Sequence, residues 1–462
     1  MTTRPGPASR FQPSTEKKQM HGKQMILGMQ LGNGYGTQPG AWRAPGVDPA
    51  DFTSFDKLVG YAQAAERGKL QFLFLPDFQA LRVDIEHAPP AGTLEPMLTL
   101  AAIARGTARI GMVATGSTTF NEPYNLARQF KTLDVMSHGR AGWNAVTTSD
   151  PRAAANYGGE IAPRDERYER AHEVIQVVQA LWGSWGRDAL VTDVEAGRFA
   201  DASRVQPINL RGRHVASCGP LPVPPSEQGQ PVIFQAGGSS HGLGLAGMYA
   251  SGIIGATWTI EDARAQRATI REAAERSGRN PDEVKFFAGV LPAAAPTKRK
   301  ALDQRIALGG QAFPDQVGYL GSMLGIPLGA HQLDQPLTPS QLAAARASAS
   351  DPRAGHALEV AREGWTLRDV LAHGVIDYHP VITGPPSEVA DHMQEWFEAD
   401  AVDGFWVVMD VYNPGVDTFV DEVVPILQER GLFHLDYETS TLRGHLGVPD
   451  QYGLDPRLVS NS

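Results

Sequence analysis

Short apolar runs of strand length alternate with segments of helical period along most of this chain, and this alternation constrains the fold more than any other feature. The apolar runs lie at residues 25–31, 71–76, 109–115, 140–146, 231–235, 253–258, 284–291 and 404–409. Helical segments between and after them include residues 55–67, 124–136, 167–182, 263–277, 387–399 and 416–430. Strands that alternate with helices predict a parallel sheet. Because eight such strands close a TIM (β/α)8 barrel, we predict this α/β fold, with the functional site at the carboxyl ends of the strands.

Charge and composition argue against several classes of partner. The formal net charge of -10 and the sequence pI near 5.7 leave no broad basic surface for phosphates, so we expect no nucleic acid partner. No run approaches the roughly 20 apolar residues that cross a bilayer, so we expect no membrane attachment. Cys218 is the single cysteine, which excludes an intramolecular disulfide and a thiolate metal site. The simplest location is a reducing cytoplasm.

The chain is longer than a minimal barrel needs, and the extra residues fall in four places. Residues 1–20 are predicted to be a disordered leader, and residues 21–430 a single barrel domain. Two insertions are expected in that domain, at about 185–230 and 292–386. Since the second follows the carboxyl end of the seventh strand, we expect it to form a lid over the site. Residues 431–462 are expected to be a C-terminal arm that packs on the barrel or on a second subunit.

Small polar side chains follow several of the predicted strands. Asp77 follows the second strand, Thr115 closes the third, and Asn144, Thr148 and Ser149 lie on or after the fourth. Carboxylate, amide and hydroxyl groups at one rim suit a neutral heterocycle better than a metal ion. A helix cap or loop acid at Asp77, and a plain polar turn after the fourth strand, are the alternative interpretations.

The segment 231–247 reads as a strand, a Gly-Ser turn and the start of a helix. Ala236, Gly237, Gly238 and Ser239 form that turn. Backbone N–H groups at a helix N-terminus, with no Cβ in the way, make a cradle for phosphate. The alternative is a serine cap after a flexible turn.

Other motifs compete for the same residues. The pattern Gly-X-Ser-X-Gly at 238–242 makes Ser240 a candidate hydrolase nucleophile, with Asp410 and His434 as partners in the required order. The Gly-X-Gly-X-X-Gly pattern at 242–247 begins too far after its strand for a dinucleotide site. The histidines lack the spacing of metal ligands, and His379 is interpreted as a loop histidine. We expect no metal site.

Several longer motifs resemble the bacterial luciferase-like flavin monooxygenases. The similar segments include Gly-Ala-Trp-Arg at 40–43, Glu-Pro-Tyr-Asn-Leu-Ala-Arg at 122–128, Ser-His-Gly-Arg-Ala-Gly-Trp-Asn at 137–144, Gly-Phe at 404–405, Arg-Gly-Leu-Phe at 430–433 and Thr-Leu-Arg at 441–443. The chain is most similar to the branch with nitrilotriacetate, dibenzothiophene sulfone and long-chain alkane monooxygenases. The resemblance covers about residues 23–448.

This resemblance implies a TIM barrel that binds FMN non-covalently and receives it reduced, as FMNH2, from a separate NAD(P)H:flavin reductase. With O2, a flavin C4a-(hydro)peroxide would hydroxylate a small organic substrate or cleave its C–S or C–N bond. Carried over by position, the residues along the ring and ribityl chain would be Asp77, Thr115, Asn144, Thr148 and Ser149. Those around the phosphate would be Tyr168, Ala236, Gly237, Gly238 and Ser239. The resemblance also implies a homodimer or homotetramer.

Three positions depart from relatives in this family. Some relatives carry a histidine where this chain has residues 36–39, and another where it has Ser149, while Arg164 takes a place that is often histidine. Because these positions bear on substrate binding and proton transfer, no catalytic residue and no substrate is carried over. A serine hydrolase that uses Ser240 and a flavin-binding barrel without turnover remain the alternatives.

Overall fold

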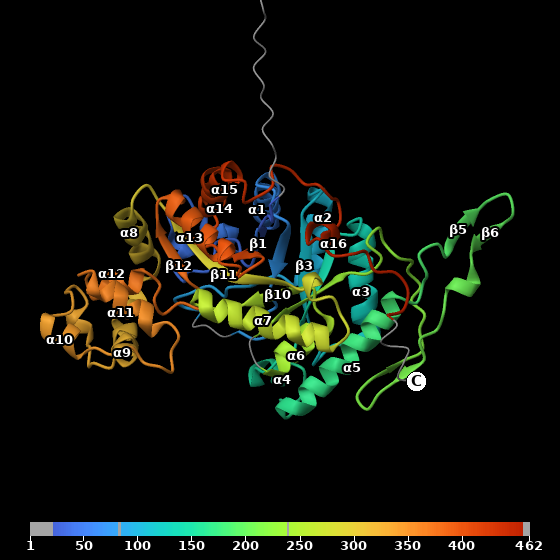
Figure 1. Ribbon diagram of the computed structural model, residues 1–462, viewed down its shortest axis with the longest axis horizontal. Coiled ribbons are helices and arrows are strands. Elements are labelled where there is room, and N and C mark those ends of the chain that lie inside the picture. The colour runs from blue at the N-terminus through green and yellow to red at the C-terminus, as the bar shows by residue number, and fades with distance from the viewer. Residues whose placement is uncertain (1–21, 82–84, 238–239, 456–462) are drawn as a thin grey trace, which may run out of the picture.

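The computed structural model describes residues 22–81, 85–237 and 240–455 (Figure 1). The predicted leader, residues 1–20, lies outside this range, and so do Gly238 and Ser239 of the predicted phosphate cradle.

Parallel strands form a closed barrel in the described part of the chain. The eight strands are β1 (Ile26–Gln30), β2 (Phe72–Leu75), β3 (Gly111–Ser117), β4 (Ala141–Val146), β9 (Val232–Ala236), β10 (Gly252–Gly255), β11 (Lys285–Ala294) and β13 (Gly404–Val407). They pair in the order β10-β9-β4-β3-β2-β1-β13-β11, and β10 pairs with β11 to close the ring. Each strand overlaps one predicted apolar run, so the TIM barrel prediction is confirmed. Almost every strand residue is buried, as expected for strands that helices cover on the outside.

Helices surround the barrel (Figure 1). They are α1 (Phe55–Arg67), α2 (Pro96–Gly106), α3 (Pro123–Met136), α4 (Pro151–Asn156), α5 (Arg164–Trp182), α6 (Ser240–Tyr249), α7 (Ile260–Arg276), α13 (Pro386–Glu398), α14 (Gly415–Thr418) and α15 (Val424–Glu429). The predicted helical segment at 416–430 is confirmed, and a π-helical turn at Phe419–Val423 joins α14 to α15 within it. Pro425 has no backbone N–H to donate, so the hydrogen-bond ladder shifts there.

Aromatic rings fill the middle of the barrel. The rings of Phe72, Phe234 and Phe287 lie with centroids 5.2 to 6.1 Å apart. Gly28 and Gly252 make room for them, since a Cβ at either position would overlap a phenylalanine ring. The barrel is therefore a packed core and not a pore, and the space at the barrel mouth lies above this aromatic layer.

The C-terminal arm closes the opposite end of the barrel. Its short helix α16 (Leu442–His445) places Leu442 against Gly111 and Gly142, at the amino ends of β3 and β4. The backbone N–H of Leu442 donates to the carbonyl oxygen of Gly139 at 2.9 Å. Arg443 is buried and donates to the carbonyl oxygens of residues 230 and 231. The arm thus packs on its own barrel.

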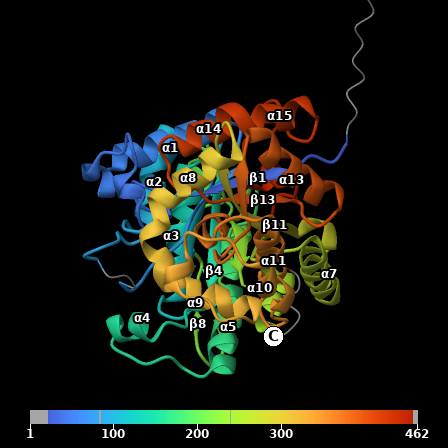
Figure 2. The same cartoon turned by 90° about the vertical axis from the view of Figure 1, so that its left-hand side faces the viewer.

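Two long segments extend beyond the barrel. Between α5 and β9 the chain forms two small hairpins, β5 (Leu190–Asp193) with β6 (Arg198–Ala200) and β7 (Leu210–Arg211) with β8 (Ala216–Ser217). Between β11 and α13 it forms α8 (Lys298–Gly309), α9 (Phe313–Leu324), α10 (Pro339–Ala344), α11 (Ala354–Arg362), α12 (Leu367–Ala372) and β12 (Val381–Gly384). These helices have a hydrophobic core of their own. The β5–β6 hairpin and α9–α12 lie at opposite ends of the molecule (Figure 1), and Figure 2 shows α9–α11 from the front.

β12 was not predicted from the sequence. It pairs in parallel with the second half of β11, from Leu291↔Val381 to Ala294↔Gly384. The inserted segment therefore returns to the barrel as a strand. Among the described helices, none is long and apolar enough to cross a membrane.

Candidate functional site

A cavity of about 990 Å³ opens at the carboxyl ends of the barrel strands. Its volume is within the range of cofactor and ligand sites. Several predicted site residues line it, namely Asp77, Thr115, Asn144, Thr148, Ser149, Ala236 and Gly237. The strands bring these residues together from four separate parts of the chain, as the strand-end argument predicted.

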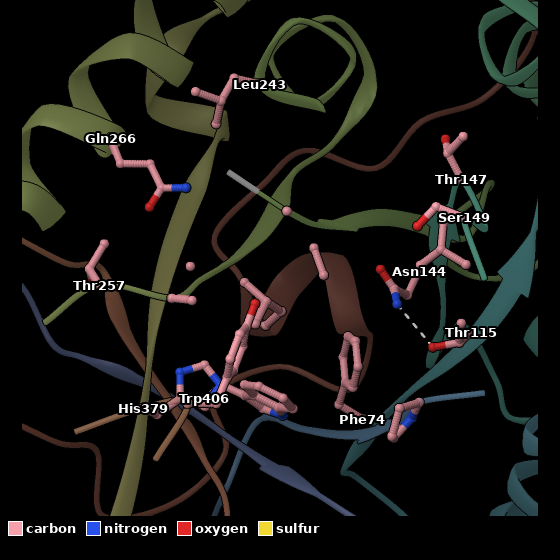
Figure 3. A pocket seen from close by; sticks show the side chains of 18 of the residues that line it. Phe74, Thr115, Asn144, Thr147, Ser149, Leu243, Thr257, Gln266, His379 and Trp406 are labelled. Atoms are coloured by element: carbon pink, nitrogen blue, oxygen red, sulfur yellow. Dashed lines mark hydrogen bonds between the residues drawn. The ribbon is translucent and has the colours of Figure 1, made fainter. Parts of the chain in front are cut away.

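The amide of Asn144 is held in one orientation at the bottom of the cavity. Asn144 on β4 and Thr115 on β3 are neighbours in the strand register, and both are buried. The Nδ2 of Asn144 donates to the Oγ1 of Thr115 at 2.9 Å (Figure 3). This bond leaves the Asn144 Oδ1 buried without a partner in the described structure. The oxygen is therefore available as an acceptor for a molecule in the cavity.

The loop after β4 is fixed by hydrogen bonds to its neighbours. The hydroxyl of Thr148 lies 2.8 Å from that of Ser117 and donates to the Oε1 of Gln79 at 3.2 Å. The guanidinium of Arg167, on α5, donates to the carbonyl oxygen of Thr148. Ser149 follows on the cavity wall. The rim is thus held by side chains of three βα units.

Asp77 is a half-buried carboxyl just beyond β2. Burial raises its pKa above the ordinary aspartate range, and the nearby carboxylate of Glu95 raises it further. A hydrogen bond from Gln79 acts in the opposite direction. A group of this kind is suited to a polar contact inside a cavity.

The predicted phosphate region lies at one edge of the cavity. Gly237 follows β9 with φ of +140°, a backbone conformation that favours glycine, and α6 begins at Ser240. Tyr168 of α5 is not among the described residues that line the cavity. Its ring packs against the imidazole of His241, with centroids 5.2 Å apart. His241 in turn pairs with Asp165 at 3.1 Å. Tyr168 therefore stands beside the first turn of α6.

The wall opposite Asn144 contains residues that the sequence analysis did not select. Figure 3 shows His379 and Trp406 together, with Asn144 and Thr115 on the other side of the cavity. His379 does lie in a loop, just before β12, but the residue is only 4% exposed and it lines the cavity. Trp406 lies on the predicted eighth strand, so period-two alternation could have placed it inside the barrel. His379 had no such signal, since it comes from the inserted segment.

Unsatisfied polar atoms cluster in this cavity. Among the described residues, these buried atoms with no hydrogen-bond partner include the Asn144 Oδ1, Thr147 Oγ1, Thr257 Oγ1 and Trp406 Nε1. A buried polar group without a partner costs about 1 to 3 kcal/mol, so native proteins contain few of them. Their concentration in one cavity indicates a site for a molecule that supplies both donors and acceptors.

The hydrolase alternative is not supported by the geometry. Asp410 forms a buried ion pair with Arg305, the carboxylate Oδ2 lying 2.9 Å from Nε. The Nε2 of His434 lies 2.7 Å from the carbonyl oxygen of Lys69, and His434 borders a hollow with Met25 and Ile26 at the start of β1. The two proposed partners of Ser240 are thus at opposite ends of the barrel. In the described parts of the chain, no three His, Cys, Asp or Glu side chains gather as a metal site.

Comparison with known proteins gives consistent matches over nearly the whole chain. A family model described as "Luciferase-like monooxygenase" matches residues 29–403. N-acetyl-S-(2-succino)cysteine monooxygenase of Bacillus subtilis (strain 168) is 39% identical over 92% of this chain and 97% of its own length. Nitrilotriacetate monooxygenase component A of Aminobacter aminovorans is 37% identical over 92% of this chain and 97% of its own length.

Solved structures agree with these sequence matches. The EDTA monooxygenase of Chelativorans sp. BNC1 superposes with a TM-score of 0.78 at 31% identity, covering 92% of this chain and 99% of that one. A riboflavin lyase solved with modified FMN and riboflavin superposes with a TM-score of 0.74 at 31% identity, covering 95% and 100%. Each similarity spans the barrel together with its insertions.

Proposed function

The chain belongs to the luciferase-like monooxygenase family, and from this premise we propose that the cavity at its barrel mouth binds reduced FMN beside a small organic substrate. The protein is an FMN-dependent monooxygenase. The observation that carries the assignment of the site is the cluster of unsatisfied donors and acceptors in a cavity of about 990 Å³.

The residues of the cavity fit a flavin. The isoalloxazine ring is flat, with carbonyl and N–H groups along its edges. The unsatisfied Asn144 Oδ1 offers an acceptor and the Trp406 Nε1 a donor. The rings of Phe74 and Trp406, 5.3 Å apart, supply apolar surface at the bottom of the cavity. Asp77, Thr115, Thr148 and Ser149 complete the polar rim.

We assign the phosphate to the turn before α6. Ala236 and Gly237 border the cavity, and Tyr168 stands beside the first turn of the helix. Backbone N–H groups at a helix N-terminus attract anions. Gly238 and Ser239 belong to the same predicted cradle, although they lie outside the described residues.

When bound, reduced FMN supplies the two electrons that activate O2, so that one oxygen atom enters the substrate and the other leaves as water. The protein's part is to orient the ring, through Asn144 and its bond to Thr115, and to exclude water from the reacting atoms. The inserted segment contributes Pro352, Tyr378 and His379 to the cavity wall.

We propose that the substrate is a small molecule with a C–N or C–S bond next to an oxidisable carbon. The support is the identity of 37 to 39% with proteins named for nitrilotriacetate and for N-acetyl-S-(2-succino)cysteine. Hydroxylation of the carbon next to nitrogen or sulfur gives an adduct that breaks apart, which would cleave the bond.

We further propose that a separate NAD(P)H:flavin reductase delivers the reduced flavin, as the name "component A" of one relative suggests for that protein. We also propose that the enzyme acts in the cytoplasm, where NAD(P)H is available, and that it is a homodimer or homotetramer.

Anaerobic titration with reduced FMN tests the site, and Asn144→Leu is the informative variant. We expect saturable binding by the wild type and about tenfold weaker binding by Asn144→Leu, since one buried hydrogen bond is lost and Thr115 loses its partner. Asn125→Leu, on the exposed side of α3, is the matched control and should bind like the wild type. Failure of the wild type to bind would refute the assignment.

The phosphate assignment is tested by comparing FMN with riboflavin, which lacks the phosphate. The double variant Ser239→Ala with Tyr168→Phe should weaken binding of FMN and leave that of riboflavin unchanged. An equal effect on both ligands would place the phosphate elsewhere.

Turnover is tested with a generic flavin reductase, NADH, FMN and 18O2 against a panel of thioethers, sulfones and tertiary amines. Mass spectrometry should find one labelled oxygen in the product. Tight flavin binding without incorporation across a broad panel would instead favour a flavin-binding barrel without turnover.

A further inference from the structure

His379 differs from the other cavity residues in its origin. Most of the wall comes from barrel strands and the loops that follow them, whereas His379 belongs to the segment inserted between β11 and α13. It precedes β12, which pairs with the second half of β11. A residue of the inserted segment therefore reaches the inner wall of the barrel mouth.

The barrel leaves a space for this imidazole. Gly289 of β11 is the register partner of Trp406, whose indole lines the cavity. A Cβ at Gly289 would overlap the Nδ1, Cε1 and Cγ atoms of His379. Because Gly289 has no side chain, the His379 ring occupies the space that a side chain at this position of β11 would fill.

Two aromatic rings hold the imidazole edge-on. The ring of Trp406 lies 5.2 Å away at 90°, and that of Tyr378 lies 4.7 Å away at 81°. The backbone before it is also fixed, because Arg305, which is 5% exposed, pairs with Asp377. Arg353 donates to the carbonyl oxygens of Ile376 and Asp377. The ring is therefore positioned before any ligand binds.

The protonation of the ring follows from its surroundings. Burial lowers the pKa of His379 to about 4, so the imidazole is neutral at pH 7. The Nδ1 is buried against Gly289 and has no partner. A proton on Nδ1 would be a buried donor without an acceptor, and such donors are rarer than unpaired acceptors. The neutral ring therefore carries its proton on Nε2, the nitrogen that is left to serve the cavity.

We propose that His379 is a neutral hydrogen-bond donor that contacts the flavin directly through Nε2–H, and that Gly289 is the residue that makes room for it. The inference rests on the proposed function, namely that the cavity holds FMN. It assigns the flavin contact on this side of the cavity to the inserted segment, opposite the contact made by Asn144.

Replacing His379 by Gln or by Asn tests its two ring nitrogens separately. In His379→Gln the side-chain amide reaches the place of Nε2, whereas in His379→Asn it reaches the place of Nδ1. We would titrate the wild type and both variants with FMN and, under anaerobic conditions, with reduced FMN. His379→Leu removes both nitrogens. His392→Gln is the matched control, since His392 packs on Trp396 of α13, away from the cavity.

We expect His379→Gln and His392→Gln to bind within about threefold of the wild type. His379→Asn and His379→Leu should bind about tenfold more weakly, because one hydrogen bond is lost. The circular dichroism spectra of these variants should match that of the wild type. If the His379 side chain acted only by filling space, His379→Gln and His379→Asn would not differ in their affinity for FMN.

Equal FMN binding by all the His379 variants would refute the contact between His379 and the flavin. Strong binding by His379→Asn together with weak binding by His379→Gln would assign the contact to Nδ1 instead of Nε2. If the wild type itself does not bind FMN, the proposed function fails together with this inference. The wild-type titration therefore distinguishes the two failures.

Discussion

At the scale of single residues, Arg140 shows how a strand is held at its amino end. The residue is 3% exposed, and its Nε and two Nη atoms donate to the hydroxyl of Thr107 and to the carbonyl oxygens of residues 104, 107, 110 and 137. The side chain therefore ties β4 to the ends of α2 and α3. Five satisfied bonds explain how a charged group is tolerated in the core.

We predict that Arg140→Leu lowers the free energy of unfolding by about 3 kcal/mol or more, because several buried carbonyl groups lose their donor. Urea unfolding followed by circular dichroism measures this. Arg128→Leu is the control, because Arg128 is exposed on α3 and its guanidinium donates to the neighbouring side chain of Asn125 at 3.2 Å. Its effect should stay within about 0.5 kcal/mol. Similar losses in both variants would contradict the role of burial.

A second prediction at this scale concerns Gly289. In Gly289→Ala the new methyl group must displace the ring of His379, so we expect FMN affinity to fall about as much as in His379→Leu, roughly tenfold. Combining the two substitutions should bring little further loss, because both remove the same contact. Additive losses in flavin titrations would show that Gly289 acts on some other group.

The residues of the site were predictable to different degrees. Asp77, Thr115, Asn144, Thr148 and Ser149 each follow or close a buried strand, and the barrel brings such positions to one rim. His379 lies in an insertion whose path no local pattern reveals. Its place depends on Gly289, which is ninety residues earlier in the chain, so only the tertiary structure joins them.

At the scale of elements, the inserted helices are joined to the barrel by one buried ionic cluster. Arg305 of α8 pairs with Asp377 and with Asp410, which follows β13, and it donates to the carbonyl oxygen of Ala372. Gln38, after β1, donates to the Asp410 carboxylate at 3.0 Å. Burial raises the pKa of Asp410 even though Arg305 opposes the shift. Removal of the arginine would leave buried carboxylates without a counter-charge.

We predict that Arg305→Leu costs about 3 to 5 kcal/mol of stability, the usual result of leaving a buried charge unpaired. It should also weaken FMN binding, because Asp377 no longer fixes the segment that carries His379. Restoring neutrality in Arg305→Leu with Asp410→Leu and Asp377→Asn should recover much of the stability. Thermal unfolding and flavin titration measure the two effects, and an unaltered melting temperature for Arg305→Leu would contradict the prediction.

Strands and helices were predicted well where a single hydrophobic period runs through the whole element. The eight barrel strands and α1 (Phe55–Arg67) follow directly from apolar runs and helical spacing. β12 has only four residues, and its pairing partner is the far end of β11, so its sequence carries no separate signal. The π-helical turn between α14 and α15 was not predicted, because the apolar spacing continues across Pro425, although proline cannot complete the ladder of hydrogen bonds.

At the scale of the whole molecule, burial of a neutral histidine makes stability depend on pH. The pKa of His379 is about 4 in the fold, because of burial, and near 6.5 in an unfolded chain. Between these values the unfolded chain binds a proton that the native protein does not. The free energy of unfolding therefore falls as the pH falls below about 6.5.

We predict that the wild type loses about 2 kcal/mol more stability than His379→Gln between pH 7 and pH 5. Urea unfolding at both pH values gives the difference, in which groups common to both proteins cancel. A wild-type loss no larger than that of His379→Gln would show that the ring is protonated in the native protein.

The length of β11 has a consequence for how the inserted segment can move. One continuous strand serves the barrel with its first half and the returning segment with its second, where four residue pairs join it to β12. Rotation of the inserted helices as a rigid flap about that connection would have to break this ladder. We therefore expect a ligand to enter and leave the cavity without a swing of the inserted helices away from the barrel.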